Sequence, residues 1–386
     1  MFSKNIKFEN FHNKKINKNL RKLYKSLIKK KNDKKFLINT FSKAYNYSFN
    51  KKILKKYKKF NIYQIYGMGG SSLGARAIYN FIKPNIKKKF YFYDNLDAKN
   101  KLLSGRNNSL SIIISKSGNT LETIVNENIF SSKKKLFITE NKNNYLRKLA
   151  YKLKAEIIEH NNFVGGRYSV LSEVGMLPAE LMGLNSNKFK KFDKLILNKN
   201  FEKNLLINVN YLYHLVKKKK TNSIILNYDE SSYNLFKWYQ QLVAESLGKK
   251  SNGILPIISD MPKDNHSLMQ LYLDGNQNSF FTFFDVLVPS SPKIKGEEIL
   301  ENFEHLKKHS LQSIKLAQKQ ATKNVFLAKK IPFRSFEVLK KNEESLGELF
   351  TFFMLETILL GKMMKVNPFD QPSVELIKRE TKKILL

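Results

Sequence analysis

Apolar and polar residues alternate along most of this chain in blocks that predict strands and helices in turn. Short apolar runs typical of buried strands are separated by amphipathic, helix-like stretches, and the first four runs span residues 61–66, 90–93, 111–115 and 135–139. A second series begins near residue 200, with strand-like runs at 223–228, 254–258 and 280–288. Helical stretches accompany this second series, through Tyr211 and Leu215 and over residues 231–247.

This order of elements predicts an α/β fold. Strands that alternate with helices are joined by right-handed crossovers and form mostly parallel sheets with helices on both faces. The two series predict two tandem αβα sandwich domains, the first over residues 56–195 and the second over 196–345. Residues 1–55 carry leucines at helix-like intervals and are expected to form a helical arm, and residues 346–386 are expected to form two C-terminal helices.

The composition fits a folded protein of a reducing compartment. The chain has 386 residues, of which 42% are hydrophobic, so it can bury a sizeable core. It has no cysteine, which excludes disulfides and thiolate metal sites. No segment runs about 18 residues without a charged or strongly polar group. We therefore expect a cytoplasmic protein that does not associate with a membrane.

The formal net charge of +38 raises the question of nucleic-acid binding. Lysine tracts such as residues 217–220 recur along the whole chain, often beside asparagines, and aromatic residues do not alternate with them on one face. This pattern is typical of a lysine- and asparagine-rich composition on solvated surfaces, so we expect no specific nucleic-acid partner. The positive field still favours small anionic substrates.

The stretch GMGGSSLG, which begins at Gly67, is the first of two candidate anion-binding loops. It follows a predicted strand and opens a predicted helix, where unpaired backbone N–H groups and the helix dipole attract anions. Gly67, Gly69 and Ser72 nearly match a dinucleotide-binding fingerprint, and Asp94 ends the next strand as a ribose-binding acid does. A dehydrogenase is therefore a rival interpretation, and a glycine-rich turn without a ligand is another.

The stretch IIISKSGNTLET, which begins at Ile112, supplies the second loop. In a parallel sheet both loops follow the carboxyl ends of strands and lie at the same edge. One phosphate can then be surrounded by the hydroxyls of Ser71, Ser115, Ser117 and Thr120. The alternative is an ordinary helix cap formed by Ser117 or Asn119, which accounts for one hydroxyl but not for four.

Two stretches contain a candidate charge stabiliser and a candidate base. GGRYSVLSEVG places Arg167 after two glycines, where a guanidinium can reach an oxyanion, although a loop arginine more often forms a surface ion pair. In WYQQLVAESLGK, Gln241 and Glu245 are four residues apart and share a helix face that could carry a base beside an amide. Glu245 and Lys249 also have the spacing of a surface ion pair, which is the interpretation that these residues alone favour.

Further candidate groups lie in the C-terminal half. DNHSLMQLYLDG places His266 near a predicted helix start, where a capping or surface histidine is the simpler interpretation. NPFDQPSVELIK supplies Gln371 and, about two helical turns later, Lys378. His305 and His309 have the spacing of helical metal ligands, but lysines lie between them, so we expect a solvated face there.

Taken in order, these segments resemble the phosphoglucose isomerase family over most of the chain, from about residue 60 to 380. Six motifs in the family's order carry the resemblance: GMGGSSLG, SKSGNTLET, GGRYSVLSEVG, QLVAESLGK, NHSLMQLYLDG and FDQPSVELIK. No single motif decides it, whereas the ordered set is specific. The resemblance implies two sugar-isomerase (SIS) domains, a homodimer with active sites at the subunit interface, and no metal or organic cofactor.

The resemblance also implies an activity and a role for each matched residue. The enzyme would interconvert D-glucose 6-phosphate and D-fructose 6-phosphate in glycolysis and gluconeogenesis, with Glu245 moving a proton between C2 and C1 through a cis-enediol intermediate. Arg167 would stabilise the developing negative charge. His266, donated by the neighbouring subunit, and Lys378 would assist ring opening, and Glu122 would lie near that histidine. Substrate would be bound by Gly70, Ser71, Ser115, Lys116 through its backbone, Ser117, Thr120, Gln241 and Gln371.

Two alternatives stay open beside this interpretation. A dual-specificity phosphoglucose/phosphomannose isomerase belongs to the same superfamily, and the sequence does not exclude mannose 6-phosphate as a substrate. A non-catalytic SIS module that senses sugar phosphates would keep both loops but would not need Glu245, His266 and Lys378 together. The joint presence of these three residues favours the enzyme.

Overall fold

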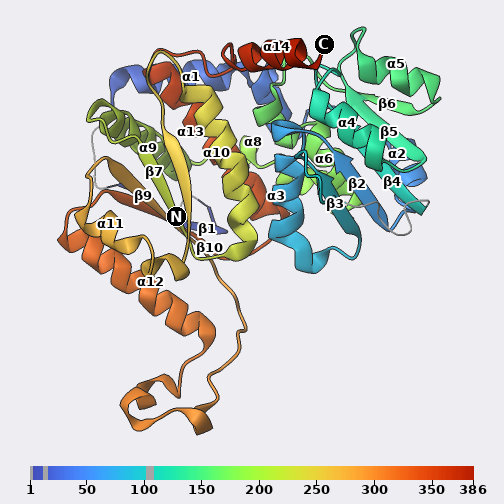
Figure 1. The fold of residues 1–386 in the computed structure, drawn as a ribbon. Helices are drawn as coiled ribbons and strands as arrows, with labels where there is room; N and C mark the ends of the chain where they lie inside the picture. Colours follow the sequence, from blue (N-terminus) through green and yellow to red (C-terminus); the bar gives the residue numbers. More distant parts are fainter. Residues whose placement is uncertain (1–2, 12–15, 101–107) are drawn as a thin grey trace.

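The computed structural model describes residues 3–11, 16–100 and 108–386, in which two sheets lie side by side with helices around and between them (Figure 1). The first sheet has the strand order β3-β2-β4-β5-β6, and its strands are parallel. These strands are β2 (Ile62–Tyr66), β3 (Lys89–Tyr93), β4 (Ser109–Ile114), β5 (Lys134–Thr139) and β6 (Glu156–Glu159). The helices of this half include α3 (Leu73–Ile82), α4 (Leu121–Phe130), α5 (Tyr145–Lys152) and α6 (Glu173–Leu181).

The second sheet has the strand order β1-β10-β9-β7-β8. Strands β7 (Asn222–Asn227), β8 (Leu255–Asp260), β9 (Ser279–Val286) and β10 (Phe333–Val338) are parallel, and β1 (Ile6–Glu9) pairs antiparallel with β10 at the edge. The helices of this half are α9 (Lys199–Lys217), α10 (Tyr233–Leu247), α11 (Met269–Asp274), α12 (Leu311–Ala328) and α13 (Glu343–Met363). Shorter helices α7 (Ser186–Phe189) and α8 (Phe192–Leu195) connect the halves, and α14 (Val374–Leu385) ends the chain.

The hydrophobic pattern follows from burial. Every residue of β4 is buried, as expected for a central parallel strand with both faces covered. Helix α13 is apolar around most of its circumference because it lies inside the protein, against α7, α9 and α10. Helix α10 also packs against α3, so it joins the two halves of the molecule.

The structure confirms the predicted α/β fold class with two mostly parallel sheets, and each strand-like run named above overlaps a strand. The N-terminal segment contains the expected helices, α1 (Lys18–Lys29) and α2 (Lys51–Tyr57), and in addition strand β1, which was not predicted. Strand β1 has only four residues, IKFE, which is too short for a periodic signal. The domain limits at residues 55, 195 and 345 stay predictions. In the described ranges, each helix is too short or too polar to span a bilayer.

A buried ion pair explains why β10, FRSFEV, does not look like a central strand. The Arg334 side chain is 0% exposed and Glu356 of α13 is 2% exposed, and the two form an ion pair. Arg334 also donates hydrogen bonds to Tyr239 of α10 (3.2 Å) and Asn208 of α9 (2.8 Å). This network holds three helices on the second sheet, and one of them, α10, carries Gln241 and Glu245.

Candidate active site

The first glycine loop leads from β2 through a 3₁₀ turn (Gly69–Ser71) into α3. Its glycines allow unusually close packing: Gly69 has φ +53°, and a Cβ atom there would lie 2.6 Å from Nε2 of Gln241. A Cβ atom on Gly70 would lie 2.1 Å from the carbonyl carbon of Gly166. The loop therefore touches both the segment of Arg167 and the helix of Glu245. Asp94, considered above as a ribose ligand, instead pairs with Arg76 of α3 at 3.1 Å.

The second loop leads from β4 into α4 and places its hydroxyls close together. Ser115 Oγ lies 2.8 Å from Thr120 Oγ1 and 3.5 Å from Ser117 Oγ, and the backbone N–H of Gly118 donates to Ser115 Oγ at 3.1 Å. Thr120 is the N-cap residue of α4, and no described side chain forms the cap hydrogen bond. The alternative that Ser117 or Asn119 caps this helix is therefore wrong.

The two loops are neighbours in space. Strand β2 pairs in parallel with β4, with Tyr66 opposite Ile113, so both loops leave the same edge of the first sheet side by side. The Lys116 side chain points away from this edge, because its Nζ donates to the carbonyl of Asn162 (2.7 Å) and lies 3.4 Å from Glu140. Only backbone groups of Lys116 remain at the loop, and their role in binding a substrate stays a prediction.

Arg167 is the centre of the candidate site. It lies in a 3₁₀ segment (Gly166–Leu171), and its side chain is only 2% exposed. Its five N–H donors all have partners: Nε donates to Ser246 Oγ (2.8 Å), Nη1 to Glu245 (3.2 Å) and to Gln371 Oε1 (2.8 Å), and Nη2 to the carbonyls of Pro368 (2.7 Å) and Asp370 (2.9 Å). An oxyanion that binds this guanidinium must therefore replace one of these acceptors. Glu245 and Gln371 are the acceptors whose side chains can move without breaking the backbone contacts.

Helix α10 presents Gln241 and Glu245 together. Gln241 Nε2 lies 3.5 Å from both carboxylate oxygens of Glu245, and Gln241 Oε1 is buried without a partner among the described residues. That oxygen can accept a hydrogen bond from a substrate hydroxyl. The surface ion pair considered for Glu245 and Lys249 is wrong: Glu245 pairs with Arg167, and Lys249 pairs with Asp370 at 3.0 Å.

The C-terminal segment brings Gln371 to the site but leaves Lys378 on an exposed helix. Gln371 accepts the hydrogen bond from Arg167 just before α14 begins. Lys378 lies on α14 and is exposed. Glu122 lies in the first turn of α4, directly after the second loop, and is half-buried.

His266 lies far from Glu245 within one chain. Helix α10 follows β7 and precedes β8, so Glu245, near the C-terminal end of α10, lies near the start of β8. His266 follows the end of β8 and is exposed. The six residues of β8 separate the two positions by roughly 20 Å, at about 3.3 Å per residue. Among the described residues, the His266 side chain forms no hydrogen bond or ion pair.

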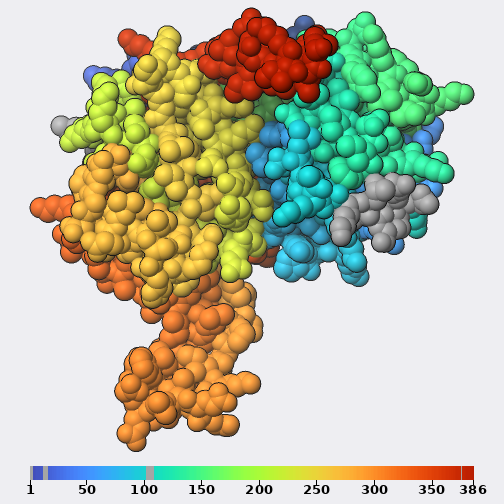
Figure 2. All heavy atoms as spheres, viewed as in Figure 1, coloured from blue at the N-terminus to red at the C-terminus, as the bar shows by residue number. Residues whose placement is uncertain are grey.

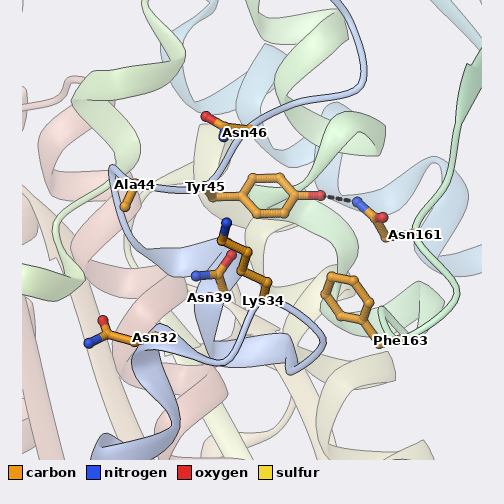
Figure 3. A pocket seen from close by; sticks show the side chains of 8 residues that line it. All are labelled: Asn32, Lys34, Asn39, Ala44, Tyr45, Asn46, Asn161 and Phe163. Atoms are coloured by element: carbon orange, nitrogen blue, oxygen red, sulfur yellow. Dashed lines mark hydrogen bonds between the residues drawn. The ribbon is translucent and has the colours of Figure 1, made fainter.

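A separate cavity of about 340 Å³ lies beside the first half of the molecule (Figure 3). It is lined mainly by polar side chains of the N-terminal segment, together with Asn161 and Phe163, and Asn161 donates a hydrogen bond to Tyr45. It contains none of the candidate residues, so the site is better described by the contacts above.

Comparison with known proteins gives the family. The family model described as phosphoglucose isomerase matches residues 55–255, which is more than half of the chain. The chain belongs to the phosphoglucose isomerase family. A glucose-6-phosphate isomerase of Methanocaldococcus jannaschii is 35% identical over 84% of this chain and 85% of the relative. One of Mycoplasmopsis pulmonis is 31% identical over 83% of this chain and 82% of the relative.

Solved structures agree with the fold of the phosphoglucose isomerase family. A hypothetical protein of Thermus thermophilus is similar with a TM-score of 0.81 and 22% identity, over 95% of this chain and 94% of that chain. A glucose-6-phosphate isomerase of Chlamydia trachomatis is similar with a TM-score of 0.67 and 20% identity, over 86% and 71% of the two chains. The family model and the two relatives confirm the resemblance drawn from the six motifs, and the solved structures agree with it in fold.

Some residues around the site of this phosphoglucose isomerase family member escaped the sequence analysis. Ser246 and Tyr168 have hydroxyls 2.9 Å apart, and Tyr168 donates to the Pro368 carbonyl at 3.2 Å. Burial raises the pKa of Tyr168 to about 12, so the hydroxyl stays protonated and able to donate. Both residues lie inside quoted motifs, GGRYSVLSEVG and QLVAESLGK, directly after Arg167 and Glu245, and that adjacency was the only available signal.

Proposed function

We propose that this chain is an aldose-ketose isomerase that interconverts D-glucose 6-phosphate and D-fructose 6-phosphate, in glycolysis and gluconeogenesis. The observation that carries the proposal is the position of the Glu245 carboxylate. It lies 3.2 Å from the Arg167 guanidinium, on a helix that touches the first glycine loop through Gln241. A base, a fixed positive charge and an anion-binding edge thus meet at one place.

The proposed chemistry uses these groups in sequence. The substrate phosphate binds at the edge formed by both loops, where helix N-termini and hydroxyls favour an anion. The Glu245 carboxylate takes the proton from C2 of the open-chain aldose, which gives a cis-enediol intermediate. It then delivers the proton to C1. Negative charge develops on the enediol oxygens, and the guanidinium of Arg167 stabilises it after exchanging one of its present acceptors for substrate. The Gln241 carbonyl oxygen positions a substrate hydroxyl.

The phosphate contacts are proposed residue by residue. Hydroxyl donors come from Ser71, Ser115, Ser117 and Thr120, and backbone N–H donors come from Gly70 and Lys116. Gln371 leaves Arg167 to close over the phosphate, and Lys378 assists ring opening from α14. The 2.8 Å contact between Ser115 and Thr120 supports this arrangement, because hydroxyls that already lie together can turn toward one anion without moving the backbone.

The proton transfer is tested by Glu245→Gln, which keeps the shape of the side chain but removes the base. We expect isomerisation to fall by at least about 100-fold, the usual contribution of a general base, while fructose 6-phosphate still binds. The matched control is Glu337→Gln, which changes a carboxylate on β10, three strands away from β8 in the second sheet. A coupled spectrophotometric assay measures both variants, with glucose 6-phosphate and mannose 6-phosphate in parallel. Substantial turnover by Glu245→Gln refutes the assignment, and turnover of mannose 6-phosphate establishes the dual-specificity alternative.

We also propose that the enzyme acts in the cytoplasm as a homodimer in which His266 enters the site of the partner. The roughly 20 Å along β8 between this histidine and Glu245 supports the proposal, since an exposed imidazole that cannot serve its own site can serve another. The segment 287–310, between β9 and α12, projects from the body of the molecule (Figures 1 and 2). It carries apolar side chains, Leu300 (76% exposed) and Phe303 (53% exposed), that a second copy could cover.

Hybrid dimers that contain one Glu245→Gln subunit and one His266→Ala subunit test whether His266 enters the partner's site. Glu245→Gln and His266→Ala are each expected to be inactive, but mixing the unfolded variants and refolding them together gives hybrids with one complete site. Random pairing makes half the dimers hybrid, each with one working site of two, so recovery of about a quarter of wild-type activity is expected. No recovery above that of the separate variants contradicts the shared site.

A further inference from the structure

Helix α14 has almost no packing of its own. Of its described side chains only Thr381 is half-buried and the rest are exposed, including Ile377 (71%) and Ile384 (85%). Figure 2 shows the helix lying on the outside of the molecule. A helix without buried side chains is not positioned by a hydrophobic face, so its place must be set by the chain that leads into it.

That chain is residues 367–371, which we call the tether, and contacts hold it along its length. The Pro368 carbonyl accepts hydrogen bonds from Arg167 and Tyr168, and Phe369 packs edge-on against Phe36 with ring centres 6.2 Å apart. Within the tether, Asn367 Nδ2 donates to Asp370 at 2.9 Å. The tether ends with Gln371, which contacts Arg167.

Lys249 is the second cationic side chain, after Arg167, that contacts the tether. It stands just beyond the C-terminal end of α10, with its side chain 13% exposed. Its ammonium donates to the carbonyls of Ser246 (3.1 Å) and Asn367 (2.5 Å) and to the Asp370 carboxylate (3.0 Å). These three acceptors use its three N–H donors. The hydrogen bond from Lys249 also holds the pKa of Asp370 below its ordinary value.

We propose that Lys249 is a positioning residue that ties the tether to the end of α10, so that Gln371 and the start of α14 face the sugar-phosphate site. The inference rests on the proposed isomerase function. Glu245 and Lys249 are four residues apart on either side of Gly248, and therefore the same short segment that presents the base also fixes the chain that closes over the substrate. Loss of the ammonium removes the contacts to Asn367 and Asp370 and leaves the hydrogen bonds from Arg167 and Tyr168, so the tether is less restrained and Gln371 leaves its present position more often, while Glu245 and Arg167 keep their contact.

The test compares Lys249→Met with Lys250→Met, which removes the neighbouring exposed lysine. We expect Lys249→Met to raise KM for fructose 6-phosphate about 5-fold to 10-fold, less than the loss typical of a buried charge-assisted hydrogen bond because the Asp370 side chain is 51% exposed, with kcat within about 2-fold of wild type. Lys249→Arg should restore KM to within about 2-fold, because it keeps the charge and the donors. Asp370→Asn should add little to Lys249→Met, because the two residues act through one contact.

Hydrogen exchange over residues 374–386 provides a second readout that does not depend on activity. Faster exchange in Lys249→Met than in Lys250→Met is expected, and equal exchange together with an unchanged KM overturns the inference. A kcat that falls as much as KM rises also overturns it, since that pattern places Lys249 in general support of the fold. If wild-type enzyme lacks isomerase activity, the proposed function fails, and the exchange comparison still decides whether Lys249 fixes α14.

Discussion

Replacing Gly70 with alanine tests whether the site depends on close contact between its first loop and the segment of Arg167. A Cβ atom at position 70 would lie 2.1 Å from the carbonyl carbon of Gly166, 2.2 Å from its oxygen and 2.5 Å from the nitrogen of Arg167. These are all backbone atoms, so no side-chain rotation can relieve the overlap. Ordinary contact begins at 3.4 Å, so the two segments must separate by about 1 Å or more. A displacement of about 1 Å at reacting groups costs roughly 100-fold in rate.

We therefore expect kcat/KM of Gly70→Ala to fall roughly 100-fold, which corresponds to about 2.7 kcal/mol of transition-state stabilisation. The coupled assay with fructose 6-phosphate measures it, after circular dichroism has shown that the variant is folded. Gly165→Ala is the matched control: its Cβ atom would meet nothing closer than 3.7 Å, and Gly165 has an ordinary φ of −71°. A folded Gly70→Ala with more than a third of wild-type activity, or a Gly165→Ala that is equally impaired, refutes the reasoning.

Two further predictions concern stability. Glu356→Leu should lower the free energy of unfolding by about 3–5 kcal/mol, because it leaves the buried Arg334 charge unpaired. Glu337→Gln breaks an exposed ion pair and should change the free energy of unfolding by less than about 1 kcal/mol. Urea unfolding measures both variants, and equal effects would contradict this ranking. Burial lowers the pKa of Lys190 to about 7 in the folded protein. Between pH 7 and roughly 10, Lys190 therefore binds more protons in the unfolded chain than in the folded protein, and its contribution to the free energy of unfolding rises with pH. Lys190→Met should remove that rise, and a stability difference between wild type and variant that does not change with pH would exclude it.

The sequence predicted the elements whose signal is local. Strand β4 could be read from three consecutive isoleucines, and the hydroxyl loop after it from its composition, because both depend on neighbouring residues only. The two loops could be placed at one sheet edge by the topology rule for parallel strands, and the pairing of β2 with β4 agrees with that step. The roles assigned to individual loop residues stay predictions.

Contacts that join distant segments could not be predicted in this way. Whether Glu245 pairs with Lys249 or with Arg167 depends on how α10 packs against the first half of the molecule, and the helical spacing alone favoured the wrong partner. Strand β10 could not be predicted for a similar reason. A charged residue such as Arg334 is not expected in a buried strand, and its partner Glu356 is 22 residues later in the chain. Such pairings need the tertiary structure because the separation along the chain carries no periodic signal.

A difference between the two otherwise similar halves explains why, among the described residues, we propose a phosphate edge in the first half only. Strand β7 leads through Asp229 and a 3₁₀ turn (Glu230–Ser232) into α10, much as β2 leads through its glycine loop into α3. In the second half, however, the Asp229 carboxylate accepts a hydrogen bond from Ser231 Oγ (2.7 Å) and lies 3.2 Å from Nζ of Lys341. The Asp229 carboxylate therefore already occupies the Ser231 hydroxyl and the Lys341 ammonium, the groups that a phosphate would need. This difference supports our proposal that the first half binds the phosphate, and α10, which begins at this filled loop, carries Glu245 near its other end.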